Sequence, residues 1–212
     1  MIQPRDIRAI IFDLDGTLYV SPGFEQVVWQ SVSNYTAQLL GCSPGEGDVA
    51  LRNRREELTK ERGTVQTIAS AIETLGGSIQ EMHRRFADEI DPTHHIHPSP
   101  DVTHLMEEVQ HRYTSWLLTN NNAVLTGKIL QRLDLTHVFH RIITIDDTWL
   151  PKPDATVLTQ ILAELALAPH QILFVGDRYD IDLRLPAAAG CQVFLTQEVD
   201  ELLRLGELLL RA

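Results

Sequence analysis

Apolar and polar residues change their spacing several times along this chain of 212 residues. Residues 8–12 form a short apolar run without alternation, which predicts a strand covered on both faces. From residue 99 onward, short apolar runs and helical spacings take turns. Further strands are predicted at residues 115–119, 142–145, 172–177 and 192–195, and helices at 102–109, 124–133 and 153–167, before Gly190 and from Val199.

Residues 24–90 differ, because apolar side chains recur there at helical spacing and no strand pattern interrupts them. The first helix is predicted at residues 24–40, with Gly41 as its stop. Later helices are predicted to begin at Ser43, Thr64 and Ser78. Each of the two serines is followed by a glutamate three residues later, which is the capping-box pattern.

Five strands separated by helices predict a parallel sheet with helices on both faces. The all-helical block falls between the first strand and the rest, so we expect an inserted domain. The predicted fold class is α/β, a Rossmann-like doubly wound parallel sheet of about five strands with an inserted all-helical cap. The predicted domains are the cap, residues 20–96, and the catalytic core, residues 1–19 with 97–212.

Composition narrows the class of protein. The chain is 43% hydrophobic and 22% charged, which is typical of a globular protein, and no apolar run reaches the length of a membrane span. Cys42 and Cys191 lie outside any metal-binding spacing, so we expect reduced core thiols and a cytoplasmic protein. The net charge of −11 argues against a nucleic-acid polymer as partner. An anionic substrate would need a divalent cation and a few placed cations.

Polar side chains collect at the ends of the predicted strands, where ligands bind in such sheets. Asp13 and Asp15 follow the first strand, and Gly16 permits a tight turn. Two carboxylates this close resist joint ionisation unless a cation or a polar loop receives them. Thr119 and Asn120 follow the second strand, Lys152 lies after the third, and Asp177 ends the fourth.

These positions resemble the four signatures of the haloacid dehalogenase-like hydrolase superfamily, most of whose members are phosphatases. The segment Asp13-Leu14-Asp15-Gly16-Thr17-Leu18 resembles the first signature. Thr119-Asn120 resembles the second, Lys152 the third, and Gly176-Asp177 with Asp182 the fourth. They occur in the family's order and span the whole core. The turn after Asp15 and the arginine-rich second cap helix are faintly similar to pyrimidine 5'-nucleotidases, which often carry asparagine in place of Gly16.

The resemblance implies a magnesium-dependent phosphomonoester hydrolase. Asp13 would be the nucleophile that forms an aspartyl-phosphate, and Asp15 the general acid and then the general base. Lys152 would offset the charge of Asp13 and of the phosphoryl group.

The resemblance also implies a ligand set. Mg²⁺ would bind Asp13, the backbone carbonyl of Asp15, and Asp177, all oxygen ligands. Thr119, the Asn120 backbone and Lys152 would hold the phosphoryl oxygens. Asp182 would support the metal through water or orient Lys152. The substrate would be a small phosphorylated metabolite, such as a nucleotide monophosphate or a sugar phosphate, and the oligomeric state is not predicted.

Other interpretations remain open. A sugar-phosphate mutase would use the same residues but shield its aspartyl-phosphate from water. A non-catalytic regulatory module on this fold would lack the nucleophile or a metal-binding acid, and none is missing here. A dehalogenase is disfavoured, because it needs only the first acid of the pair and no metal.

Several polar segments have simpler interpretations. His94, His95 and His97 are interpreted as a polar hinge linker, and Asp180 as a first-turn acid of a helix. One asparagine of residues 120–122 is expected to cap the next helix. The run from Arg52 to Arg62 is expected to be a solvated helix face, although one arginine facing the substrate stays an alternative.

Overall fold

The computed structural model describes residues 2–211 and is built on a five-stranded sheet. The strands are β1 (Ala9–Phe12), β2 (Thr114–Leu118), β3 (Arg141–Ile143), β4 (Ile172–Gly176) and β5 (Gln192–Leu195). Their order is β3-β2-β1-β4-β5, and every neighbouring pair is parallel. β1 lies in the middle, with Phe12 level with Leu117 of β2 and Val175 of β4.

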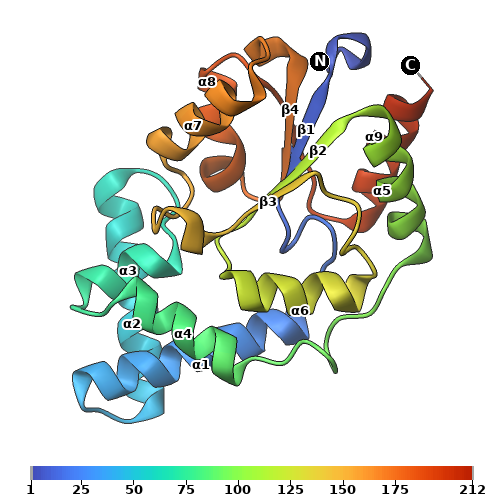
Figure 1. Cartoon of the computed structure of the whole chain (residues 1–212). Helices are drawn as coiled ribbons and strands as arrows, with labels where there is room; N and C mark the ends of the chain where they lie inside the picture. The colour runs from blue at the N-terminus through green and yellow to red at the C-terminus, as the bar shows by residue number, and fades with distance from the viewer. Residues whose placement is uncertain (1, 212) are drawn as a thin grey trace.

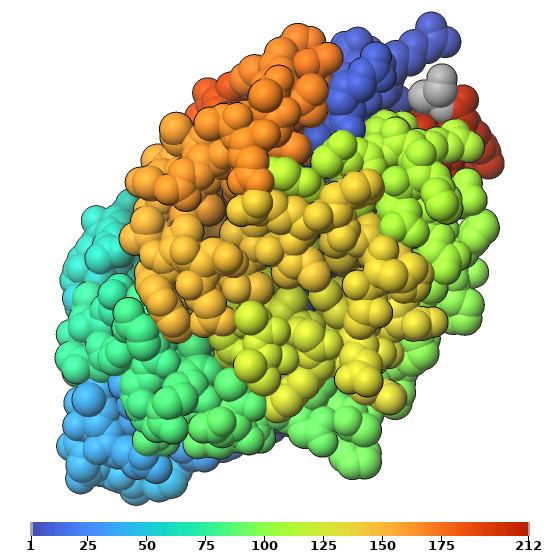
Figure 2. All heavy atoms as spheres, in the orientation of Figure 1, coloured from blue at the N-terminus to red at the C-terminus, as the bar shows by residue number. Residues whose placement is uncertain are grey.

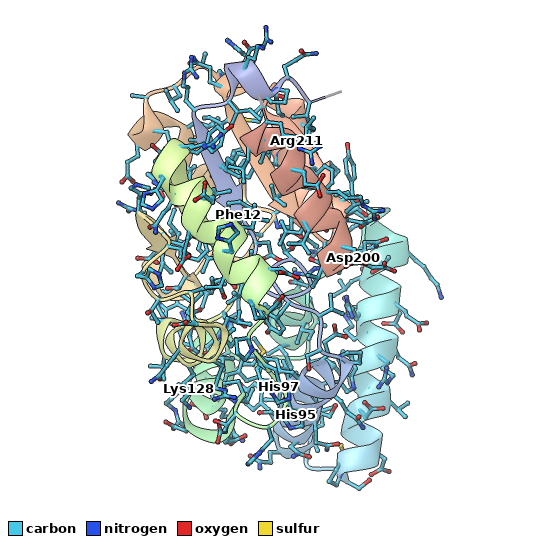
Figure 3. All side chains as sticks on the ribbon, turned by 90° about the vertical axis from the view of Figure 1, so that its right-hand side faces the viewer. Phe12, His95, His97, Lys128, Asp200 and Arg211 are labelled. Atoms are coloured by element: carbon cyan, nitrogen blue, oxygen red, sulfur yellow. The ribbon has the colours of Figure 1, made fainter. Side chains whose placement is uncertain are left out.

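Helices cover both faces of this sheet (Figure 1). The helices α5 (Pro100–Arg112), α6 (Ala123–Leu133) and α9 (Val199–Leu210) pack into one hydrophobic core, and α7 (Ala155–Leu165) into the other. Ile10 and Phe12 join the first core, whereas Ala9 and Ile11 join the second. Figure 3 shows Phe12 on the side covered by α5 and α9. The predicted doubly wound α/β fold is confirmed.

Four helices form the insertion between β1 and α5. They are α1 (Pro22–Leu40), α2 (Pro44–Arg62), α3 (Ile68–Thr74) and α4 (Ile79–Glu89), and Figure 1 shows them together beyond one end of the strands. Each begins with a serine or threonine whose hydroxyl accepts from a backbone N–H one turn later. Gly41 ends α1 with φ 66°, as predicted.

Some predicted boundaries were wrong. The helix expected from Thr64 begins at Ile68, because the Thr67 hydroxyl caps it by accepting from the N–H of Ser70, and Val65 before it is 43% exposed. The third strand ends at Ile143, because the Asp147 carboxylate binds the backbone N–H of Thr144 and closes a short 3-10 helix (Ile145–Asp147).

Other elements of the core also differ from the prediction in detail. α7 begins after Asp154, whose carboxylate caps it. A π-helical turn (Tyr179–Leu183) and α8 (Arg184–Ala188) precede Gly190. Cys191 is buried as expected, whereas Cys42 is only partly buried, and both are free thiols.

The insertion packs against the core through apolar side chains of one shared cluster, and polar contacts add to this attachment. The two connecting segments lie side by side, since the Ser21 hydroxyl donates to the carbonyl of His95 (2.7 Å). Figure 3 shows His95 and His97 near one end of the molecule, below α6 with Lys128. Lys128 donates to the carbonyls of Ala87 (2.8 Å) and Ile90 (3.0 Å) at the end of α4. Within residues 2–211, no helix combines the length and the apolar character that a membrane crossing requires.

Candidate active site

The carboxyl ends of the central strands bring the predicted site residues together. Asp13 follows β1, Thr119 follows β2 and Asp177 follows β4, while Lys152 reaches in from the loop between β3 and α7. Asp13, Thr119 and Lys152 are all at most 6% exposed. The chain places β2 and β3 on one side of β1, and β4 and β5 on its other side, so the strand order reverses between β1 and β4. A ligand is expected at the carboxyl ends of these two strands.

Lys152 is the most completely bonded side chain of the site. Its ammonium donates to Asp13 Oδ1 (2.6 Å), to Asp182 Oδ1 (2.7 Å) and to the carbonyl of Leu118 (2.9 Å). An ammonium has three donors, so all of them are used. The lysine therefore holds together two buried carboxylates from distant parts of the chain, one directly after β1 and one in the π-helical turn after β4.

The loop that carries Lys152 is itself clamped. The backbone N–H of Lys152 donates to Asn120 Oδ1 (2.7 Å), and the Asn120 amide donates to the carbonyl of Lys152 (3.3 Å). The Asn120 side chain thus positions the lysine loop, a role that the sequence did not suggest. The next asparagine but one, Asn122, caps α6 by accepting from the N–H of Leu125 (2.8 Å), as expected for one residue of this run.

The opposite charges of Lys152, Asp13 and Asp182 favour one another's ionised forms. Burial alone would lower the pKa of Lys152, but Asp13 and Asp182 raise it. Burial would raise the pKa of Asp182, but Lys152 and Arg178 lower it, so that this carboxylate stays ionised. Burial raises the pKa of Asp13, and Lys152 opposes that effect. The ammonium therefore keeps negative charge available at a buried site.

Asp15 lies in a different environment. Its Oδ1 accepts from the hydroxyl of Tyr19 and its Oδ2 from the amide of Asn121 (2.7 Å). Burial and the neighbouring Asp13 raise the pKa of Asp15 to about 6. Asp13 and Asp15 therefore have different environments: the ammonium of Lys152 binds Asp13, whereas neutral donors bind Asp15.

Asp177 carries the features of a metal ligand. Its Oδ1 is buried without a hydrogen-bond partner among residues 2–211. Burial and Asp13 raise its pKa to about 7, and Arg178, whose Nε lies 3.4 Å from Oδ1, offsets this rise only in part. One carboxylate oxygen from each of Asp13, Asp177 and Asp182 lies within 4.8 Å of the others. Three carboxylates this close together, one of which has an oxygen without a hydrogen-bond partner, fit a divalent cation such as Mg²⁺.

Gly16 keeps the space beside Asp177 open. Its backbone has φ 79°, and a Cβ at this position would lie 2.5 Å from Asp177 Oδ2. Any other residue would therefore clash with the carboxylate as well as strain the turn. This explains a glycine directly after the Asp13 and Asp15 pair.

A cavity of about 330 Å³ joins these residues to the insertion. Its floor contains Asp13, Asp15, Thr119 and Asp177, and its opposite wall comes from α1 to α4. The wall contains Phe24, Val28, Trp29, Arg55, Ile68, Met82, His83 and Phe86. Figure 2 shows the insertion and the segment after β3 in direct contact on this face of the molecule.

The sequence prediction missed several residues of this cavity. Asn121 and Tyr19 bind Asp15, and Arg178 lies 3.4 Å from Asp177 Oδ1. The signal for Asn121 was its place in a run of three asparagines, and for Tyr19 its position four residues after Asp15. His83 is 4% exposed, and burial lowers its pKa to about 4, so it is a neutral wall residue.

Other polar residues lie apart from the catalytic cluster. Asp180 accepts from the backbone N–H of Val65 (3.2 Å) and lies 3.9 Å from Arg184, so it links the π-helical turn to the insertion. Among the residues that the structure describes, the histidines of the 94–97 segment do not join a group suited to bind a metal.

Comparison with known proteins places these features in a family. Residues 7–190 match the haloacid dehalogenase-like hydrolases. The chain is 29% identical to a phosphoglycolate phosphatase of Aliivibrio fischeri (90% of this chain, 84% of that one). It is 24% identical to a glyceraldehyde 3-phosphate phosphatase of Methanopyrus kandleri (87% and 81%). A HAD phosphatase from Thermococcus onnurineus shares the fold, with a TM-score of 0.59 at 19% identity over 89% and 86% of the two chains.

Proposed function

Because the chain belongs to the haloacid dehalogenase-like hydrolase family and is a phosphatase of it, we propose that it hydrolyses small phosphomonoesters with Mg²⁺ and an aspartyl-phosphate intermediate. The observation that carries this proposal is the bridge from Lys152 to Asp13 and Asp182 beside Asp177. The buried ammonium of Lys152 favours the ionised forms of Asp13 and Asp182. It also supplies positive charge at the place where an anionic substrate must bind.

In the first step, a carboxylate oxygen of Asp13 forms a bond to phosphorus. The bond between phosphorus and the ester oxygen breaks, and Asp15 gives its proton to that oxygen, so an alcohol leaves. With a pKa of about 6, Asp15 still holds this proton in roughly one molecule in ten at pH 7, whereas an ordinary aspartate would hold it in fewer than about one in a thousand. The amide of Asn121 and the hydroxyl of Tyr19 aim its carboxyl group.

In the second step, water attacks phosphorus of the aspartyl-phosphate. Asp15, now ionised, takes a proton from this water, and the bond between phosphorus and the Asp13 oxygen breaks. Inorganic phosphate leaves, and both carboxyl groups return to their first state. The neutral donors on Asp15 suit this double role, because they do not lock it into one charge.

Magnesium would bind Asp13, the backbone carbonyl of Asp15 and Asp177. When bound, it would neutralise phosphoryl charge and align the phosphate with Asp13. Asp182 is better suited to orienting Lys152 than to direct ligation, because its Oδ1 accepts from Lys152 and its Oδ2 from the N–H of Arg178 (3.1 Å). Thr119, the backbone of Asn120 and Lys152 would hold the phosphoryl oxygens.

The insertion would act as a cap, residues 20–96, that covers the substrate. Most of the cavity wall opposite the acids comes from it. Relatives of this chain are named as phosphatases of phosphoglycolate and of glyceraldehyde 3-phosphate, so these two compounds are the first substrates to test. The free thiols of Cys42 and Cys191 suit a reducing compartment such as the cytoplasm.

The proposal is tested by release of inorganic phosphate from p-nitrophenyl phosphate and both metabolites. We expect Asp13→Asn to lower kcat by at least about 10³-fold, because it removes the nucleophile. Asp200→Asn changes an exposed acid at the start of α9 and should keep full activity (Figure 3).

The same assay tests the metal. Activity should disappear in excess chelator and return with added Mg²⁺. Near wild-type turnover by Asp13→Asn would overturn the nucleophile assignment, and full activity in chelator would overturn the metal assignment.

A further inference from the structure

Arg55 lines the cavity and has no carboxylate partner in the part of the chain that the structure describes, whereas the other arginines of the insertion are paired or, like Arg62, exposed and bonded to an amide side chain. Most of them pair with carboxylates on their own helix. These pairs are Arg52 with Asp48, Arg54 with Glu57 and Glu61, Arg84 with Glu81 and Asp88, and Arg85 with Glu81 and Glu89. Within residues 2–211, no carboxylate oxygen lies within 4.0 Å of the Arg55 guanidinium.

Arg55 is nevertheless a half-buried residue of the cavity wall. Its Nε donates to the carbonyl of Gln66 (2.7 Å), which fixes the plane of the guanidinium. A guanidinium has five N–H donors, so four remain for a ligand. Burial and the nearby Arg178 lower the pKa of Arg55, which shows that its positive charge is poorly compensated.

Arg178 connects this guanidinium to the catalytic floor. It lies 3.4 Å from Asp177 and 4.0 Å from Asp182, so acids of the floor balance its charge. Arg55 repels it from the insertion side. An anion bound between the floor and α2 would relieve this repulsion, because it would supply the carboxylate or phosphate that Arg55 lacks.

We infer that Arg55 binds a second anionic group of the substrate, on the leaving-group side. The inference rests on the proposed phosphatase function and adds a substrate class, namely small phosphomonoesters that also carry a carboxylate or a second phosphate. Arg55 is a specificity residue in this scheme, because it contacts the substrate away from phosphorus. Its side chain presents parallel donors to an oxyanion that an uncharged leaving group does not have.

The inference is tested with isosteric substrates. Phosphoglycolate carries a carboxylate, its amide (glycolamide phosphate) is neutral there, and propanediol bisphosphate carries a second phosphate. We expect Arg55→Met to lower kcat/KM for phosphoglycolate or for the bisphosphate by about 10- to 100-fold, and for the amide by much less. The anionic substrate whose kcat/KM falls more identifies the group that Arg55 prefers, a carboxylate or a phosphate. Arg54→Met removes the adjacent arginine, which pairs with Glu57, and should lower none of the three.

Two results would overturn the inference. Equal losses on all three substrates would mean that Arg55 binds the phosphoryl group, and no loss on any would mean that it only holds Gln66. Arg55→Lys provides a second variant, which should retain part of the preference for the anionic substrates because it keeps the charge.

A binding measurement separates this inference from the proposed function. Calorimetric titration with 3-phosphonopropionate, which has no bond to hydrolyse, should show weaker binding to Arg55→Met than to the wild type, with a smaller difference for its amide. The measurement stands even if the protein turns over none of the phosphate esters. If turnover of p-nitrophenyl phosphate is observed but Arg55→Met binds both phosphonates as the wild type does, the inference fails and the phosphatase function stands.

Discussion

The floor and the wall of the cavity hold their charges in opposite ways. The floor residue Asp13 is bonded to Lys152 (2.6 Å), which is also bonded to Asp182 (2.7 Å), and we include both in the floor from here on; each of the three is at most 6% exposed. On the wall, the Arg55 guanidinium faces the cavity with a backbone carbonyl as its partner. One charge is balanced by the protein, and the other is left for a ligand.

This difference follows from where the two regions lie in the fold. The floor is built on the ends of parallel strands, whose backbone is fixed by ladders on both sides. The wall is built on helices outside the sheet, which are attached to the core by apolar packing and by hydrogen bonds such as those of Lys128. A rigid floor suits a reaction common to many substrates, whereas a separately attached wall can differ without disturbing it.

The largest effect is expected from removing the lysine of the floor. Lys152→Met should lower kcat by roughly 10²- to 10³-fold, because it removes a charge that stabilises the transferring phosphoryl group. It should also cost about 3 kcal/mol of unfolding free energy at neutral pH, since Asp13 and Asp182 lose their shared cation. Lys60→Met, an exposed lysine of α2, serves as the control.

The stability loss of Lys152→Met should depend on pH with a defined sign. Without the ammonium, the folded-state pKa values of Asp13 and Asp182 rise above their values in the unfolded chain. Stability from such groups is present at low pH and is lost as pH rises through the folded pKa. Denaturant unfolding at pH 5 and pH 8 should therefore show the larger loss at pH 8. An equal loss at both pH values would contradict the shared-cation account.

An intermediate effect is expected at Asp15. In wild type, kcat/KM should fall as pH rises through about 6, since the first step needs protonated Asp15. Asn121→Ala removes a donor that favours the ionised form, so the pKa should rise and the alkaline limb should move up by about one pH unit.

The pH profile has an internal control. Ionisation of the substrate affects both proteins equally, so only the difference between the two profiles reports on Asp15. The exposed Asn53→Ala variant should show no such difference. A downward movement of the alkaline limb in Asn121→Ala would be evidence against Asp15 as the acid.

The sequence predicted the fold well because its signals are local. Apolar runs marked β1 and β4, and helical spacing marked the insertion, including the stop at Gly41. The floor was predicted from the four signatures, and the structure brings Asp13, Lys152 and Asp177 to one place. This prediction did not require knowing where the side chains point, because the carboxyl ends of parallel strands all lie at the same edge of the sheet.

The wall could not be predicted in the same way. The run from Arg52 to Arg62 was interpreted as a solvated face, which fits Arg52 and Arg54 but not Arg55. On that solvated face, Arg52 binds Asp48 four residues earlier and stacks on Trp29. Periodicity gives the position of a residue on a helix, whereas the contact of Arg55 with Gln66 depends on how α2 and α3 meet.

The smallest effect is expected where the wall is attached to the core. Lys128→Met removes two hydrogen bonds to the last carbonyls of α4 and should cost about 1 kcal/mol, or roughly 2–4 °C in Tm. Because these contacts lie far from Asp13 and Lys152, kcat on p-nitrophenyl phosphate should stay near that of Lys60→Met. If Lys128→Met instead changes the ranking of phosphoglycolate and its amide, attachment of the insertion governs substrate choice together with Arg55. If it lowers kcat as much as Lys152→Met does, the floor is not independent of the wall, and the comparison fails.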